Sequence, residues 1–192
     1  MSKIILASSS PYRRKLLERL GLAFEVIDPK VDETPRPGEP PEVLVERLAV
    51  AKARTVTQRR PGSLTIGSDQ VAAQGASIIG KPRNHEQAVQ QLRQMSGGVI
   101  KLYTGLALIN ADSGRVQSDV VTFTITFRHL SERQIDGYLR NAKPYDCTGS
   151  VRVEGLGIAL LERLEGEDPN AVIGLPLIRL VQMLENENVK VL

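Results

Sequence analysis

Residues 3–17 read KIILASSSPYRRKLL, and this stretch predicts how the fold begins. The apolar run from Ile4 to Ala7 has the length of a short buried strand. Three serines then interrupt it. Ser10 is a favourable N-cap, and Pro11 suits the first helical position because its missing N–H would be unpaired there anyway. The leucines that follow give the helix an apolar face. The stretch therefore predicts a strand, a serine turn and a helix.

Two arginines, Arg13 and Arg14, lie in the first turn of that predicted helix. Free N–H groups and the positive end of the helix dipole point at the serine turn, which includes Ser8. Positive side chains oppose the dipole at this end, so helix stability is a poor reason for them. The turn therefore predicts a site for a polyanion. The alternative is that both arginines are solvated on a surface helix.

The composition indicates one globular domain spanning residues 1–192. The chain is 41% hydrophobic and 24% charged, which is ordinary for such a domain. A net charge of +3 with 4% aromatic residues and no Trp suits a small anionic ligand and argues against a nucleic-acid partner. The single Cys147 excludes an internal disulfide. We find no signal peptide or membrane-spanning run, so we expect a cytoplasmic protein.

A proline-rich loop and a long helix follow the first unit of structure. After a strand predicted at 23–27, residues 28–41 form a loop that carries Glu33. A loop of this length inside a compact domain is often functional. The helix predicted from Pro41 to about Gln58 has Lys52 on its apolar stripe. Lys52 is either a lysine that extends its ammonium to solvent or one that reaches into a cleft.

A second short strand, predicted at 64–66, runs directly into Gly67-Ser68-Asp69-Gln70. In open α/β sheets ligands bind beyond the carboxyl ends of strands, so Asp69 is a site candidate, although turn and capping aspartates are also common there. Further along, we expect helices at about 84–96, 131–141 and 175–185, a hairpin of strands 99–109 and 116–127, and a strand at 157–164. The fold class is therefore α/β.

The polar residues at these positions are of two kinds. Candidates for holding phosphates are Ser8, Arg13, Arg14, Lys52 and Lys81. Glu33, Asp69 and Glu154 are candidates for three roles: to hold a divalent cation, to act as a general base, or to bind the edge of the nucleobase. Cleavage of a phosphoanhydride needs this mixture, because cations neutralise the phosphates while a carboxylate orients the attacking water. Two histidines and one cysteine are too few for a His-rich zinc site unless carboxylates join in. The expected metal is therefore a hard cation bound by oxygens.

Motifs along nearly the whole chain resemble those of the Maf-like nucleoside triphosphate pyrophosphatases. They are Ser8–Arg14 (SSSPYRR), Val31–Thr34 (VDET), Gly67–Gln70 (GSDQ), Gly80–Pro82 (GKP), Tyr103–Gly105 (YTG), Gly149–Ser150, Glu154–Gly155 and Gly174–Pro176 (GLP). The resemblance implies a two-lobed α/β fold of the Maf/Ham1 type, with a central mixed sheet flanked by helices and a cleft between the lobes. It also implies a homodimer that needs Mg²⁺ or Mn²⁺ and releases a nucleoside monophosphate and pyrophosphate.

Three residues resemble those of the branch that acts on 7-methyl-GTP, namely Tyr12, Gln70 and Glu154. The sibling branch, which acts on dTTP and UTP, usually has Arg at position 12 and Ala-Asp-Thr at 68–70, whereas the 7-methyl-GTP branch typically has Trp at position 12. We expect Tyr12 to stack on the cationic base and Glu154 to accept N1–H and N2–H₂ of guanine, with the Gln70 amide contacting O6.

The remaining roles follow from the resemblance together with the position of each residue. Asp69 is expected to be the catalytic carboxylate and, with Glu33, a metal ligand. Hydrolysis of dTTP or UTP stays an alternative, as does a non-catalytic nucleotide-binding regulator of cell division. Tyr12 as a surface ring and Glu154 as a loop charge or metal ligand also stay open.

Overall fold

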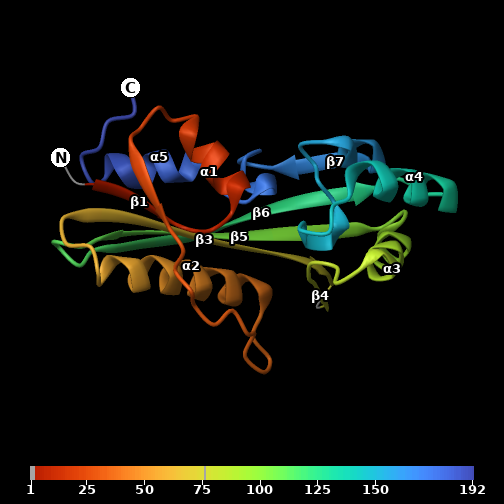
Figure 1. Cartoon of the computed structure of the whole chain (residues 1–192), viewed down its shortest axis with the longest axis horizontal. Helices are drawn as coiled ribbons and strands as arrows, with labels where there is room; N and C mark the ends of the chain where they lie inside the picture. The colour runs from red at the N-terminus through yellow and green to blue at the C-terminus, as the bar shows by residue number, and fades with distance from the viewer. Residues whose placement is uncertain (1–2, 76) are drawn as a thin grey trace. The chain divides into compact units, whose positions relative to one another are not determined.

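A computed structural model describes residues 3–75 and 77–192 of the chain and shows an α/β fold (Figure 1). The described helices are α1 (Pro11–Glu18), α2 (Pro41–Thr57), α3 (His85–Met95), α4 (Glu132–Ala142) and α5 (Leu177–Glu185). The strands are β1 (Lys3–Ala7), β2 (Phe24–Ile27), β3 (Ser63–Gln74), β4 (Ser77–Ile79), β5 (Val99–Asn110), β6 (Val116–Phe127) and β7 (Leu161–Gly166). The predicted fold class is confirmed.

The strands form one mixed sheet in the order β2-β1-β3-β5-β6-β7, with β4 paired to β3. Strand β1 is parallel to both β2 and β3, whereas β4 and β7 are antiparallel to their partners. The chain divides into two compact units. The first unit is Met1–Gln70, Thr104–Val121 and Asp168–Leu192, and the second is Val71–Tyr103 and Thr122–Glu167.

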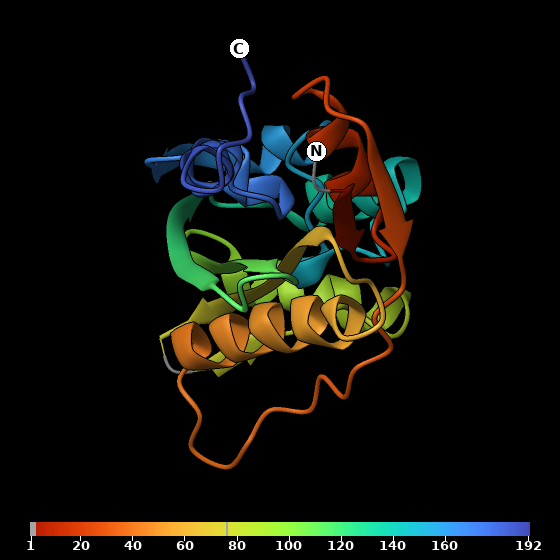
Figure 2. The same cartoon turned by 90° about the vertical axis from the view of Figure 1, so that its left-hand side faces the viewer.

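In the first unit, helices cover both faces of the parallel strands (Figures 1 and 2). Alternate residues of β1 point to opposite faces. Ile4 and Leu6 belong to the core under α1 and α5, while Ile5 and Ala7 pack with Val56 of α2. Burial on both faces explains why this strand is an unbroken apolar run.

Two glycines let α2 lie unusually close to the sheet. A Cβ on Gly67 of β3 would lie 2.1 Å from the Ala49 carbonyl oxygen, and one on Gly105 of β5 would lie 2.2 Å from that of Val45. No real side chain fits at such distances. Because α2 carries Lys52, these glycines fix how near that lysine comes to the strands.

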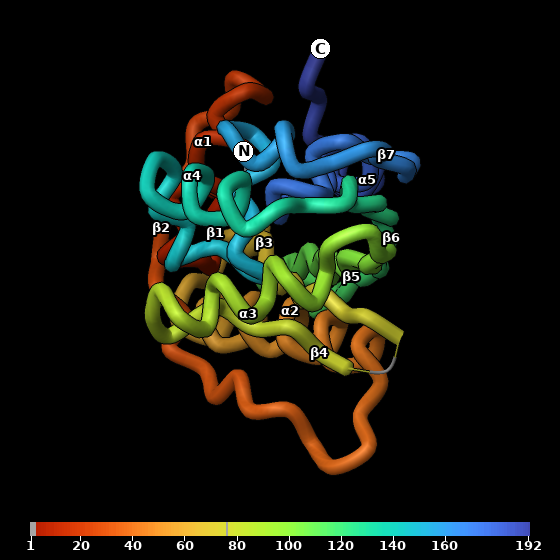
Figure 3. Tube along the Cα trace, turned by 90° about the vertical axis from the view of Figure 1, so that its right-hand side faces the viewer, coloured from red at the N-terminus to blue at the C-terminus, as the bar shows by residue number. Residues whose placement is uncertain are grey.

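In the second unit, α3 and α4 (lime and teal in Figure 3) pack against each other. Arg93 of α3 donates to both carboxylate oxygens of Glu132 on α4, at 2.7 and 2.6 Å. The side chain of Ser131 caps α4 in a full capping box with Gln134, as the sequence predicts. Polar contacts at the end of α3 and the start of α4 thus supplement the apolar packing.

Two sequence-based boundaries are wrong. The strand predicted at 157–164 is instead a 3₁₀ helix, Leu156–Leu160, followed by β7. The amide of Gly157 donates to the Arg152 carbonyl at 3.0 Å, and the tight turn that this bond closes prevents an extended chain. Strand β3 is much longer than residues 64–66 because it continues into its pairing with β4, so Asp69 lies inside the strand and not after it.

No helix in the described part of the chain is long and apolar enough to cross a membrane.

Candidate active site in the first unit

The buried ammonium of Lys52 contacts two carboxylates. Its Nζ lies 2.6 Å from Oδ1 of Asp69 and 2.5 Å from Oε1 of Glu33. Lys52 and Asp69 are 5% and 7% exposed, so water screens their ion pair little. Of the two predicted alternatives for Lys52, an ammonium extended to solvent is therefore wrong. The structure brings these three predicted site residues together.

Each of the three comes from a different element of the first unit. Lys52 lies on α2, three residues after Ala49, whose carbonyl abuts Gly67. Asp69 follows the last parallel pair between β1 and β3, Ala7 with Gly67, by two residues. The carboxylate is therefore inside β3 but beyond the end of the parallel ladder. Asp69 thus lies where ligands are expected in open α/β sheets, beyond the carboxyl ends of the parallel strands.

Glu33 belongs to the loop between β2 and α2, which is orange in Figure 2. Asp32 accepts the amide of Thr34 at 2.9 Å and its hydroxyl at 2.6 Å, and these bonds lower the pKa of Asp32. Arg47 of α2 donates to both oxygens of Glu39, at 2.6 and 2.7 Å, and to the Thr34 carbonyl at 3.2 Å. Sequence reasoning missed Arg47 and Glu39, because an eight-residue separation across a loop matches no local motif.

Arg13 faces the same cluster of charges. Its Nε donates to the Gly174 carbonyl at 2.8 Å. Desolvation by burial lowers the pKa of the guanidinium, and the nearby carboxylates of Asp69 and Glu33 oppose that change. Arginine keeps its proton in proteins, so Arg13 adds a second positive charge beside the two carboxylates.

The serine turn has the expected local structure. Ser10 caps α1, with its side chain accepting the amide of Arg13 at 3.4 Å. The hydroxyl oxygen of Ser8, a buried residue, accepts the amide of Ser10 at 3.1 Å. Tyr12 is partly buried on the same turn of helix. The serine turn therefore leads directly into α1, the helix whose first turn carries Arg13.

The segment from Asp168 to Gly174 ties several site elements together. The Gly174 carbonyl accepts a second hydrogen bond from the Ser68 hydroxyl, at 2.9 Å. The amide nitrogen of Gln70 donates to the Ala171 carbonyl at 2.7 Å and to the Thr104 hydroxyl oxygen at 2.9 Å. Both amide hydrogens of Gln70 are thus used within the protein, so a contact with guanine O6 would require breaking one of these bonds.

Asp168 anchors the other end of that segment. Its buried carboxylate accepts the amide of Asn170 at 2.9 Å and that of Ile178, in the first turn of α5, at 2.7 Å. Pro176, the residue just before α5, provides no side-chain cap. Asp168 therefore acts as the cap of this helix from a distance. A cap supplied from ten residues upstream has no sequence signature, which explains why it was missed.

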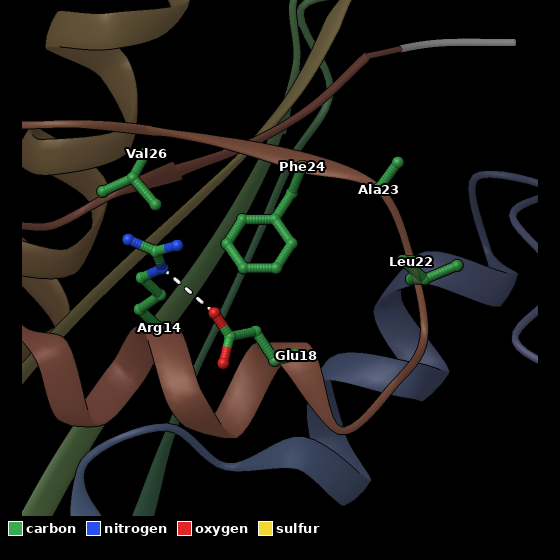
Figure 4. Close-up of a pocket in the computed structure, with 6 residues that line it drawn as sticks. All are labelled: Arg14, Glu18, Leu22, Ala23, Phe24 and Val26. Atoms are coloured by element: carbon green, nitrogen blue, oxygen red, sulfur yellow. Dashed lines mark hydrogen bonds and ion pairs between the residues drawn. The ribbon is translucent and has the colours of Figure 1, made fainter.

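Arg14 points to different neighbours from Arg13. Its Nε lies 3.0 Å from Oε1 of Glu18, and both side chains are at least half exposed. The pair lines a pocket together with Phe24 and Val26 of β2 (Figure 4). The predicted role of Arg14 in phosphate binding stays a prediction.

Lys81 and Glu154 belong to the second unit and are both exposed. The residue before Lys81 is held in place, because the Gly80 carbonyl accepts the Gly149 amide at 3.2 Å and the Gln91 side chain at 3.1 Å. Burial raises the pKa of Tyr138 to about 12, with a minor contribution from Glu154. The predicted roles of Lys81 and Glu154 stay predictions.

The donor set of Glu33 and Asp69 fits a hard cation. The two carboxylates converge on one point, where Lys52 Nζ contacts both. Among residues 3–75 and 77–192, no group of three or more His, Cys, Asp or Glu is arranged to hold a metal. Mg²⁺ is commonly bound by one or two carboxylates with water and substrate phosphate, so a pair is sufficient.

The fold and the site define an α/β protein that gathers lysine, arginine and carboxylate groups at the end of a parallel strand ladder. The chain matches the model of the family described as Maf-like protein over residues 3–187, and it belongs to that family. A relative from Nitrosococcus oceani, named 7-methyl-GTP pyrophosphatase, is 56% identical over 98% of this chain and 95% of its own length. One from Polaromonas sp. with the same name is 53% identical over 95% of this chain and 83% of its own.

Proposed function

We propose that the protein hydrolyses the α–β phosphoanhydride of 7-methyl-GTP to 7-methyl-GMP and diphosphate, and so removes a modified nucleotide from the pool. One observation carries this proposal. The chain is 56% and 53% identical, over nearly its whole length, to two relatives named 7-methyl-GTP pyrophosphatase. The cluster around Lys52 supports it, because it has the charges that the reaction requires.

Binding of the triphosphate is assigned to the cationic groups of the first unit. Lys52 and Arg13 supply two positive charges, and Ser8 lies on the turn at the start of α1. The Gly174 carbonyl fixes the Nε end of Arg13, and we assign its terminal nitrogens to phosphate oxygens. Lys81 and Arg14 join this set on the resemblance of their motifs. All of these contacts are to phosphate, so they carry no base identity.

Asp69 is assigned the role of orienting and deprotonating the attacking water. Asp69 lies inside strand β3 and is only 7% exposed, so strand pairing and burial hold its carboxylate in place, as general-base catalysis requires. Glu33 and Asp69 would together hold Mg²⁺ or Mn²⁺. When bound, that cation supplies positive charge to the phosphate oxygens.

Base choice is assigned to Tyr12 and Glu154, with Gln70 as a third candidate. A ring face favours the positive charge of N7-methylated guanine, and a carboxylate accepts both donors of the guanine edge. Gln70 contributes at least indirectly, because it holds the segment that presents the Gly174 carbonyl to Arg13. We further propose, on the resemblance alone, that the enzyme is a homodimer acting in the cytoplasm.

The test is diphosphate release from 7-methyl-GTP, GTP, dTTP and UTP, with Mg²⁺, with Mn²⁺ and with excess EDTA. We expect the highest kcat/KM for 7-methyl-GTP and no turnover in EDTA. Equal rates with dTTP would refute the assignment of the base while leaving the phosphate chemistry intact. Binding of every nucleotide without turnover would favour the non-catalytic regulator.

A matched pair of variants isolates the ring face of Tyr12. Tyr12→Leu removes it and Tyr12→Phe keeps it. Loss of a desolvated cation–π contact of about 1–2 kcal/mol lowers the preference for 7-methyl-GTP over GTP by roughly 5- to 30-fold. We expect this loss in the Leu variant and none in the Phe variant. An unchanged ratio in both would remove Tyr12 from the base site.

A further inference from the structure

The position that would suit a cation between Glu33 and Asp69 is already taken by the protein itself. Lys52 Nζ lies 2.5 Å from Glu33 and 2.6 Å from Asp69. These contacts use one oxygen of each carboxylate. The ammonium and a metal ion would therefore compete for the same pair of carboxylates.

The charges of this cluster are balanced before any ligand binds. Lys52 and Arg13 carry two positive charges, and Glu33 and Asp69 carry two negative ones. A divalent cation that enters such a site must either displace the ammonium or add two uncompensated positive charges. Like charges a few ångströms apart repel, and water screens this repulsion little on the side of Lys52 and Asp69, which are 5% and 7% exposed. We therefore expect the free protein to bind a divalent cation weakly despite its two carboxylates.

A nucleoside triphosphate changes that balance, because its phosphates bring several negative charges. The backbone of Lys52 is fixed in α2, which Gly67 and Gly105 allow to lie against the sheet. Its four-carbon stem can still rotate and carry the ammonium to a phosphate oxygen. Glu33, with 59% of its side chain exposed, is on a loop and can follow a new partner. The parts that would move are therefore side chains, not helices.

We propose that Lys52 keeps the Glu33–Asp69 pair closed to metal until nucleotide binds. The phosphates then attract the ammonium, and the two carboxylates are released to the divalent cation. Binding is consequently ordered, with the metal arriving with the nucleotide or after it. The nucleotide half of this statement rests on the proposed function, whereas the weak metal affinity of the free protein does not.

The experiment measures Mn²⁺ binding without nucleotide, by the electron paramagnetic resonance signal of free Mn²⁺. The proteins compared are the wild type, Lys52→Met, Glu33→Gln and the double variant Lys52→Met/Glu33→Gln. The matched control is Arg54→Gln, which removes one positive charge from an exposed position of the same helix. Circular dichroism confirms that each variant is folded.

We expect Lys52→Met to bind Mn²⁺ about tenfold more tightly than the wild type, or better, since it removes both the competitor and its charge. Adding Glu33→Gln should abolish the gain, and Arg54→Gln should match the wild type. A folded Lys52→Met with wild-type affinity overturns the proposal, as does a gain that persists in the double variant or appears in Arg54→Gln.

The wild type alone provides a second test, which applies even if Lys52→Met does not fold. Tight binding of Mn²⁺ by the free wild-type protein, lost in Glu33→Gln, would mean that the pair is open and would overturn the proposal. Weak binding, unchanged in Glu33→Gln, supports it. None of these measurements involves 7-methyl-GTP, so failure of the substrate assignment in the hydrolysis panel is a separate result.

Discussion

Asp69 and Glu33 contact the same ammonium but belong to regions of very different character. Asp69 lies in the middle strand β3, and only 10% of its side chain is exposed. Glu33 lies on the loop between β2 and α2, and 59% of its side chain is exposed. The strand is fixed by pairing and by core on both faces, whereas the loop depends on a few polar contacts.

This difference suggests a division of labour between the two regions. Strand β3 supplies a carboxylate whose position is set once the sheet forms. The loop supplies one that can change partners without disturbing the core, and loops that move for function are generally the less stable parts of a structure. Changes on the strand side should therefore cost more than changes on the loop side.

The largest effect is expected for the strand carboxylate itself. Asp69→Asn keeps the size of the side chain and removes its charge. If general-base catalysis is lost, kcat should fall by about 10²-fold or more. The measurement is steady-state hydrolysis of 7-methyl-GTP with Mg²⁺. A kcat close to that of the wild type would show that the catalytic carboxylate is elsewhere.

The next largest effect is expected for Gly67→Ala, which acts on the distance between β3 and α2. The new Cβ would lie 2.1 Å from the Ala49 carbonyl oxygen, so the helix must shift. Overpacking of this kind costs about 1–3 kcal/mol, measured as the free energy of unfolding in urea. The shift should also displace Lys52 relative to the strands and lower kcat/KM, because its ammonium is assigned to the triphosphate.

Gly137→Ala is the control for that variant. Gly137 lies inside α4, and a Cβ there meets no atom within 4 Å. Alanine is favoured over glycine in a helix by about 1 kcal/mol, so this variant should be as stable as the wild type or more so. A loss of stability in Gly137→Ala equal to that in Gly67→Ala would contradict the close-approach argument.

The same contrast explains what could be predicted from the sequence. The apolar run of β1 and the caps at Ser10 and Ser131 are local patterns, and they give the elements correctly. The stripe of α2 placed Lys52 on a buried face, but whether it met a carboxylate depended on tertiary structure. Contacts such as Asp168 with Ile178 join residues that no short spacing relates, and the sequence alone did not reveal them.

On the loop side, the Arg47–Glu39 pair is expected to position Glu33. Glu39→Gln keeps the size of the side chain and weakens the paired hydrogen bonds to Arg47. Residues that hold a ligand-bearing segment typically contribute about 10- to 100-fold to metal affinity or activity, and for an exposed loop we expect about tenfold in kcat/KM. Trypsin should also cleave faster after the exposed Lys30.

Arg47→Lys is the companion variant, because lysine keeps the charge but has no planar fork to bind both oxygens of Glu39. It should show the same loss of activity and the same faster cleavage. The free energy of unfolding should fall in both variants, but by less than in Gly67→Ala. Wild-type activity with faster cleavage would mean that loop order does not matter for Glu33.

The smallest effect is expected from a change in pH, which tests the contribution of the loop residue Glu39 to stability. Hydrogen bonds from Arg47 are the main reason that the pKa of Glu39 is lowered from 4.5 to about 2. A carboxyl group whose pKa is lower in the folded state stabilises the fold above its unfolded pKa, and that contribution disappears as the pH falls through the folded pKa. The Tm of the wild type should therefore exceed that of Glu39→Gln by a constant amount above about pH 5, and the gap should close toward pH 2. Differential scanning calorimetry of both proteins at matched ionic strength measures this gap. If it stayed constant down to pH 2, Arg47 would not hold the loop through the charge of Glu39.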